Sequence, residues 1–166
     1  MKENSFLGYL AYIAPAPETI SIIVLRDILM VPMAELDELM KACEKQRFVD
    51  VSPERGRLSI TSLLQKTIRD GHTPEERKNY AGTVMYSLLH HLKMGAESMG
   101  NTSKFSVYAK EYLPHLQAIQ KQFKDNKWQE INPIAREKME DIFNSTKGDI
   151  NRILFEAPRT RYFGFS

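Results

Sequence analysis

The sequence contains one cysteine and none of the short motifs by which many enzymes are recognised. Cys43 has no second cysteine with which to form a disulfide in the chain, so we expect a reducing, cytoplasmic location. The absent motifs are G-x-x-x-x-G-K-S/T, G-x-G-x-x-G, H-E-x-x-H, C-x-x-C and G-x-S-x-G. Because the chain has no phosphate-cradling loop, zinc-binding helix or serine-nucleophile turn of these kinds, we expect no catalysis, no cofactor and no metal.

The sequence also has no large excess of charge of one sign and no long hydrophobic run. Lys and Arg number 23 and Asp and Glu number 21, so the net charge of +2 does not demand a polyanionic partner. No apolar run approaches the roughly 20 residues of a transmembrane helix, so we expect no membrane span. We do not expect the apolar residues 6–14 to be a signal peptide, because Glu3 cancels the charge of Lys2 and two prolines follow.

The titratable side chains that often form sites are few and scattered. His90 and His91 are adjacent, so on a helix their side chains point about 100° apart and cannot easily share one metal. We expect them to be a surface pair at a helix end, and we place His72 and His115 at polar surface positions. Cys43 lies on an apolar stripe, so we expect an inert, buried thiol.

Residues 47–65, RFVDVSPERGRLSITSLLQ, are the most informative stretch. Apolar and polar residues alternate over 48–51 and again over 58–61, which is typical of strands. Between these runs, Pro53 presets one backbone φ and Gly56 permits a positive one. The stretch therefore predicts a β-hairpin with a longer loop.

Three apolar segments precede the hairpin, and one short helix follows it. Residues 6–13 have helical spacing that prolines at 15 and 17 end, and 19–30 favour a buried helix although a strand stays possible. Pro32 begins an amphipathic helix, and 62–70 form a helix that ends near Gly71. Three helices and a hairpin predict a winged-helix domain over residues 5–71 in a mainly α protein.

Residues 72–157 predict a helical, repeat-like region. Thr73-Pro74-Glu75-Glu76 is typical of a helix start with a capping box. We expect a loop over 95–103, a helix over 105–123 that Pro114 kinks or restarts, and a further helix over 131–143. Residues 158–166 form an aromatic tail without periodicity.

Nucleic-acid binding is one hypothesis for a winged helix. The third helix would enter the major groove, and basic side chains would meet phosphates. The candidate residues are Lys41, Lys45, Arg47, Arg55 and Arg57. The third helix also carries acidic residues, namely Glu35, Asp37, Glu38 and Glu44. Since carboxylates oppose binding to phosphates, DNA binding is the disfavoured alternative.

Three phrases of the chain resemble the STAND signalling NTPases, which include the NB-ARC and NOD-like proteins. These phrases are LGYLAYIAPAPETISIIVLRDIL, FVDVSPERGRLSITSLLQKTIRDGHTPEERKNYAGTVMYSLL and YLPHLQAI. The resemblance covers about residues 5–123 and rests on their order and spacing. It implies a winged helix followed by the start of a tetratricopeptide-like region, as found after the nucleotide-binding module of that family.

Two departures from the family pattern bear on function. Thr61 stands where the family has a nucleotide-sensing histidine, and the 166 residues contain no P-loop. The chain thus resembles the carboxy-terminal end, a truncated paralogue or a fragment of such a protein, and we expect no stabilisation by ADP.

The resemblance implies a non-catalytic regulatory module that binds a protein partner. Candidate contact residues are Tyr108, Tyr112 and His115, with Tyr162, Phe163 and Phe165 of the tail. Core packing is the alternative for the first three, because aromatic residues at helical spacing are usually buried. Disorder is the alternative for the tail.

Overall fold

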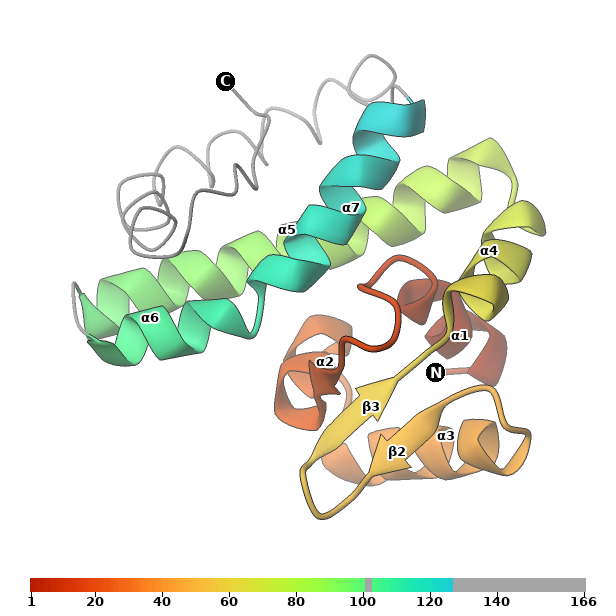
Figure 1. The fold of residues 1–166 in the computed structure, drawn as a ribbon, viewed down its shortest axis with the longest axis horizontal. Helices are drawn as coiled ribbons and strands as arrows, with labels where there is room; N and C mark the ends of the chain where they lie inside the picture. Colours follow the sequence, from red (N-terminus) through yellow and green to blue (C-terminus); the bar gives the residue numbers. More distant parts are fainter. Residues whose placement is uncertain (101–102, 127–166) are drawn as a thin grey trace. The chain divides into compact units, whose positions relative to one another are not determined.

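A computed structural model describes residues 1–100 and 103–126 of the chain. The chain forms two compact units, Met1–Val84 and a second that begins at Met85 (Figure 1). The described residues are mainly helical, with seven helices and one small antiparallel sheet. The predicted mainly α class is therefore confirmed. The helix expected over 131–143 and the tail over 158–166 lie outside the described residues.

The first unit contains a three-stranded sheet and four complete helices. Their bounds in chain order are α1 Glu3–Leu10, β1 Ile20–Ser21, α2 Ile22–Leu29, α3 Met33–Lys45, β2 Asp50–Ser52, β3 Arg57–Ser59 and α4 Ser62–Asp70. The strand order is β1-β3-β2, with Leu58 of β3 opposite both Ile20 and Val51. The predicted hairpin is thus confirmed, and a short strand from earlier in the chain pairs with its other edge.

The stretch from Thr19 to Met30 contains both of the structures considered for it. Ile20–Ser21 is a strand and Ile22–Leu29 is a helix, so the expectation of a single helix was wrong for the first residues. Ile20 is fully buried and pairs with Leu58, a residue 38 positions later. This pairing depends on the partner strand, which local propensity does not reveal.

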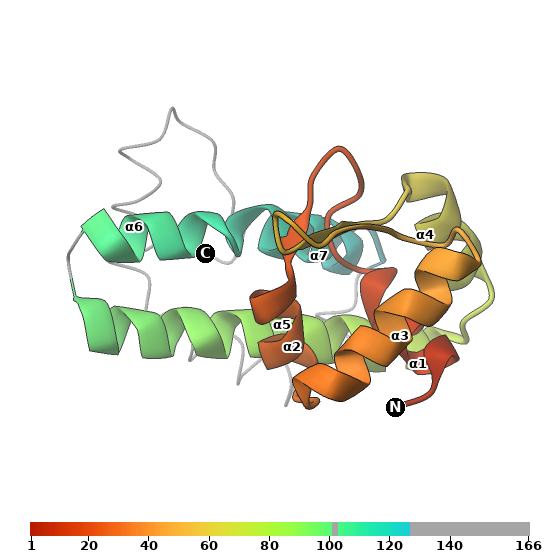
Figure 2. The same cartoon turned by 90° about the horizontal axis from the view of Figure 1, so that it is seen from below.

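The third helix, α3, forms where the apolar stripe predicts it. Leu36, Leu39, Met40 and Cys43 are buried, and α3 lies against α1 (Figure 2). Pro32 precedes the helix as its N-cap. At the other end, Arg47 adopts a positive φ of 60°, while Phe48 N–H donates to Cys43 O at 2.9 Å and Arg47 N–H donates to Glu44 O at 2.9 Å. These bonds form a Schellman-type end that turns the chain towards β2.

The fifth helix, α5 Pro74–Met99, begins at the predicted capping box. Thr73 Oγ1 accepts a hydrogen bond from Glu76 N–H at 3.1 Å, and Glu76 Oε1 accepts one from Thr73 N–H at 3.0 Å. Hydrogen bonding of the Glu76 carboxyl to the backbone of Thr73, and secondly to its side chain, lowers the pKa of that carboxyl. The first unit extends past residue 71 into α5, because Tyr80 packs on α1.

In the second unit, α6 Ser103–Lys110 lies beside the last turns of α5, and α7 Leu113–Asn126 follows (Figures 1 and 2). Pro114 stands in the first turn of α7, so the prediction that it restarts the helix is confirmed. The loop expected over 95–103 was wrong for its first half, because α5 continues to Met99. Gly95 reflects close packing inside that helix, with Tyr108 against it, and marks no turn.

Candidate functional site: the outer face of α3 and the hairpin

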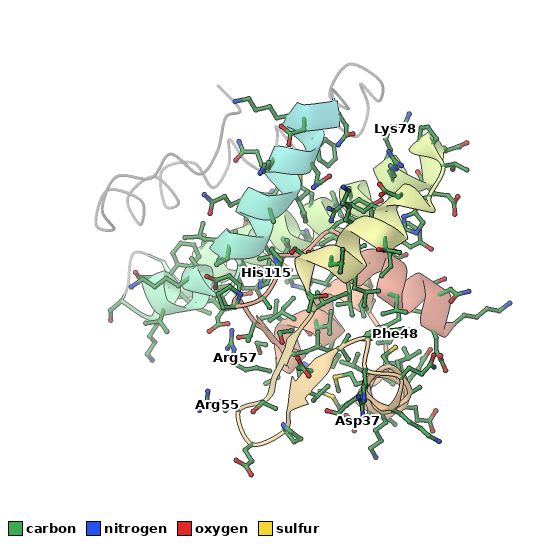
Figure 3. The ribbon with its side chains drawn as sticks, turned by 45° about the vertical axis from the view of Figure 1, so that its right-hand side comes forward. Asp37, Phe48, Arg55, Arg57, Lys78 and His115 are labelled. Atoms are coloured by element: carbon green, nitrogen blue, oxygen red, sulfur yellow. The ribbon has the colours of Figure 1, made fainter. Side chains whose placement is uncertain are left out.

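The solvent-facing side of α3 carries charges of both signs, with acidic residues in excess. Asp37, Glu38 and Glu44 are exposed and Glu35 is half-buried, whereas the exposed cations of this helix are Lys41 and Lys45. Figure 3 shows Asp37 on α3, which is there viewed nearly end-on. The face therefore presents more carboxylates than ammonium groups.

The hairpin carries the remaining basic candidates, and its two arginines differ. Arg55 is exposed in the turn between the strands, as Figure 3 shows. Arg57 is half-buried on β3, where its Nη2 donates to Thr19 O at 3.1 Å and its Nε donates to Thr19 Oγ1. Arg57 therefore joins the chain before β1 to β3. Its side chain has a structural role here, which the alternation of the sequence did not indicate.

Thr61 is the N-cap of α4. Its backbone is extended, with φ −75° and ψ 150°, and its Oγ1 accepts a hydrogen bond from Leu64 N–H at 3.3 Å. Thr61 therefore caps the helix that begins at Ser62, since threonine oxygen satisfies one of the free N–H groups at a helix start.

Polar side chains of α4 bind the end of α1. Gln65 is 2% exposed, and its Nε2 donates to Leu10 O at 3.0 Å and to Ile13 O at 2.7 Å. Arg69 Nη1 donates to Ala11 O at 2.7 Å. Because the last carbonyl groups of a helix lack partners within it, these bonds allow α1 to end at Leu10 while the chain stays buried. No pattern in the sequence indicates this role.

An aromatic cluster lies beside these bonds and consists of Tyr9, Tyr12, His72 and Tyr80. The His72 ring is stacked with Tyr80 at 4.8 Å and with Tyr12 at 6.0 Å between ring centroids. Tyr9 meets Tyr80 edge-on at 4.8 Å. A Cβ added at Gly8 would lie 2.7 Å from the Tyr80 ring, so glycine makes room for it. The half-buried His72 belongs to this packing, which corrects its expected place among polar surface residues.

The residues of the second unit that were predicted to contact a partner lie largely inside that unit. Tyr112 and His115 are each 1% exposed, so the prediction that they contact a partner was wrong, and core packing explains them. Tyr108 is half-buried, and its hydroxyl accepts from Tyr112 at 2.8 Å and donates to His91 O at 3.2 Å. The expected polar surface position of His115 was wrong as well. Tyr162, Phe163 and Phe165 lie outside the described residues.

Replacing Gly95 tests this packing in the second unit. A Cβ at position 95 would lie 2.9 Å from Cδ1 of Tyr108 and still closer to its Cε1, so the ring must move. We expect Gly95→Ala to lower the free energy of unfolding by about 1 kcal/mol, because overpacking outweighs the gain in helix propensity. Urea unfolding followed by circular dichroism measures this change.

The control for Gly95→Ala is the same substitution in a Tyr108→Ala background. Without the ring, the added methyl meets no tyrosine, and the substitution should stabilise the protein by up to about 1 kcal/mol through helix propensity. If Gly95→Ala has the same sign in both backgrounds, the contact with Tyr108 does not decide the cost.

The remaining candidate side chains have no arrangement typical of a catalytic site. His90 and His91 are half-buried in the interior of α5, so the expected helix-end position was wrong. Cys43 is fully buried, as expected, and burial followed by the charge of Glu3 raises the pKa of its thiol to about 11. Within residues 1–100 and 103–126, no group of three His, Cys, Asp or Glu side chains is placed to hold a metal. None of the helices in these residues has the length and apolar character to cross a membrane.

Comparison of the chain with protein-family models, with curated proteins and with solved structures finds no match.

Proposed function

We propose that residues 5–71 form a winged helix and that the protein is a non-catalytic, cytoplasmic regulatory module that binds a protein partner. The order α1-β1-α2-α3-β2-β3 and the strand order β1-β3-β2 support the winged helix, because three helices are followed by a hairpin whose inner strand also pairs with β1. The resemblance to the winged-helix and repeat arm of STAND-type signalling proteins supports the regulatory role.

The single observation that favours a protein partner over DNA is the charge of the outer face of α3. In helix-turn-helix proteins the corresponding helix lies in the major groove and its neighbours contact phosphates. Here that face carries Asp37, Glu38 and Glu44 in exposed positions. These carboxylates would oppose the electrostatic attraction that supplies most non-specific affinity for DNA.

The helices after α4 support the resemblance to the repeat arm of STAND-type proteins. The phrase Tyr112-Leu113-Pro114-His115 stands at the start of α7, and α5 and α6 are neighbouring helices. We propose that they begin a tetratricopeptide-like region. Thr61, which stands where the family has a nucleotide-sensing histidine, caps α4 with its hydroxyl.

We expect the full chain not to bind duplex DNA of random sequence in about 50 mM salt, where non-specific binding is strong. Fluorescence anisotropy of a labelled duplex measures this. The matched variant Asp37→Lys with Glu38→Lys should gain weak binding that falls as salt rises, because it reverses the charges that oppose phosphates. A salt-dependent affinity of the unmodified chain for DNA would overturn the preference for a protein partner.

The alternative is a winged-helix DNA-binding regulator. The exposure of Lys41, Lys45, Arg47 and Arg55 is the observation in its favour. Under this alternative, Arg55→Ala should weaken DNA binding of the unmodified chain and reduce the dependence of the affinity on salt, because a phosphate contact is lost.

A further inference from the structure

The solvent-facing side of α2 carries two large apolar residues, one at each end of the helix. Ile23 in its first turn is 59% exposed, and Met30, directly after its last residue, is 86% exposed. Between them lie Arg26 and Asp27, which are half-buried. Residues three, four and seven positions apart lie on one side of a helix, so these four residues share one face, which we call the α2 face.

Met30 has a backbone conformation that glycine adopts more easily. Its φ of 55° and ψ of 43° lie in the left-handed region, where glycine and asparagine are the usual residues at a helix end. Its N–H donates to Arg26 O at 2.8 Å, so Met30 closes the helix as a glycine would. A bulky residue in this conformation is strained, and the exposed side chain gains almost no burial in return. The fold of the first unit therefore does not account for a large apolar side chain at position 30.

The two charged residues of the α2 face lie at its middle. Arg26 Nη2 lies 3.3 Å from Asp27 Oδ1, and the two side chains are 40% and 34% exposed. The intervals between the four residues of the face are three, one and three positions, which read the same from either end. When two such helices pack antiparallel about a two-fold axis, Arg26 of each copy meets Asp27 of the other, and Ile23 meets Met30. The face is therefore complementary to itself in charge and in apolar character.

We propose that the α2 face binds a second copy of this chain, with the two α2 helices packed antiparallel about a two-fold axis. Burial of Ile23 and Met30 supplies the affinity, because these side chains are apolar and accessible. The two pairs of Arg26 with Asp27 between the copies select the antiparallel register, since accessible ion pairs contribute more to specificity than to affinity. A net charge of only +2 opposes the association weakly. This association is independent of the partner proposed above for α3.

The small size of the α2 face determines how strong the association should be. Stable interfaces bury roughly 1,200–2,000 Å² in total, and four side chains from each copy cover less than that. We therefore expect a weak, reversible dimer with a dissociation constant on the order of 100 µM. Sedimentation equilibrium of the full chain between about 10 µM and 1 mM, a range that brackets this value, should show the average mass rising towards that of two chains.

Met30→Gly removes the apolar side chain and relieves the left-handed backbone conformation. The dissociation constant should rise at least tenfold, whereas the midpoint of urea unfolding should change little, because glycine suits this φ. A loss of association would then not come from a loss of folding. Leu63→Ala is the control, because Leu63 is 76% exposed on α4 and does not belong to the α2 face. This variant should keep the dissociation constant of the unmodified chain.

Charge reversal tests the two-fold arrangement itself. Asp27→Arg places arginines opposite each other across the axis, and Arg26→Asp does the same with carboxylates. Each variant alone should therefore dissociate at least tenfold more readily than the unmodified chain. An equimolar mixture of the two variants should recover the association, because every pair across the axis then joins opposite charges. A folding defect in either variant would not produce recovery on mixing.

Three results would overturn the proposal. The first is an unmodified chain that stays monomeric at about 1 mM, ten times the expected dissociation constant. This result would also be obtained if a different protein covers the α2 face, or if nothing does. The second is a Met30→Gly variant that associates as strongly as the unmodified chain. The third is a mixture of the two charge variants that stays monomeric.

Discussion

Leu58→Ala is expected to lower the free energy of unfolding by about 3 kcal/mol, the typical cost of truncating a fully buried leucine. Leu58 is fully buried on β3, the central strand, and lies opposite Ile20 of β1 and Val51 of β2. Its side chain is part of the core on which the hairpin packs, so truncation leaves a cavity there. The free energy of unfolding of small proteins is only about 5–15 kcal/mol. This loss should therefore shift the midpoint of urea unfolding to a clearly lower urea concentration.

The matched control for this prediction is Leu63→Ala. Leu63 is 76% exposed in the first turn of α4, so its truncation leaves no cavity and should change the free energy of unfolding by less than about 0.5 kcal/mol. The two substitutions remove the same atoms from sites of opposite burial. Equal costs would mean that Leu58 is not packed in the core as described.

Gln65→Met is expected to lower the free energy of unfolding by about 2 kcal/mol, because it leaves a buried carbonyl without its donor. Gln65 Nε2 is bonded to Ile13 O at 2.7 Å and to Leu10 O at 3.0 Å, and Leu10 O also accepts a longer bond of 3.4 Å from Ile13 N–H. Methionine has a similar length and flexibility but no donor, so the change isolates the hydrogen bonds. Thermal and urea unfolding both measure the effect.

Lys66→Met is the control for Gln65→Met, since it introduces the same side chain at the next, exposed position of α4. We expect a change within about 0.5 kcal/mol there. If the two variants are equally stable, the bonds from Gln65 to the end of α1 contribute nothing net. If Gln65→Met alone is destabilised, α4 is held to α1 chiefly by this side chain and by Arg69.

Local features were predictable where a few adjacent residues decide the backbone. Thr73 and Glu76 form their capping box because both partners lie within one turn. Gly56 takes a positive φ of 62° in the hairpin turn, as expected for glycine after Pro53 and before β3. Pro114 lies in the first turn of α7, where its fixed φ suits the helix and its missing N–H costs nothing.

The candidate site was predictable in its charges but not in its contacts. The excess of carboxylates on α3 follows from residue types at helical spacing, and the structure exposes them. Arg57 was grouped with the exposed cations, yet it bonds to Thr19, which lies 38 residues earlier. Tyr112 and His115 were expected at a partner surface, yet both are buried. Spacing along one helix shows which side chains share a face, but not which face another helix covers.

The sequence by itself determined the positions of the helices and hairpin of the first unit, the turn between the strands and the helix caps. Those features depend on backbone preferences and on interactions across one or two turns. Only the tertiary structure decided that Ile20 starts a strand, that Gly95 continues a helix against Tyr108, and that the rings of His72, Tyr12 and Tyr80 pack together. The reason is that each of these outcomes depends on a partner far along the chain, and burial against that partner outweighs the weak local preference of the residue itself.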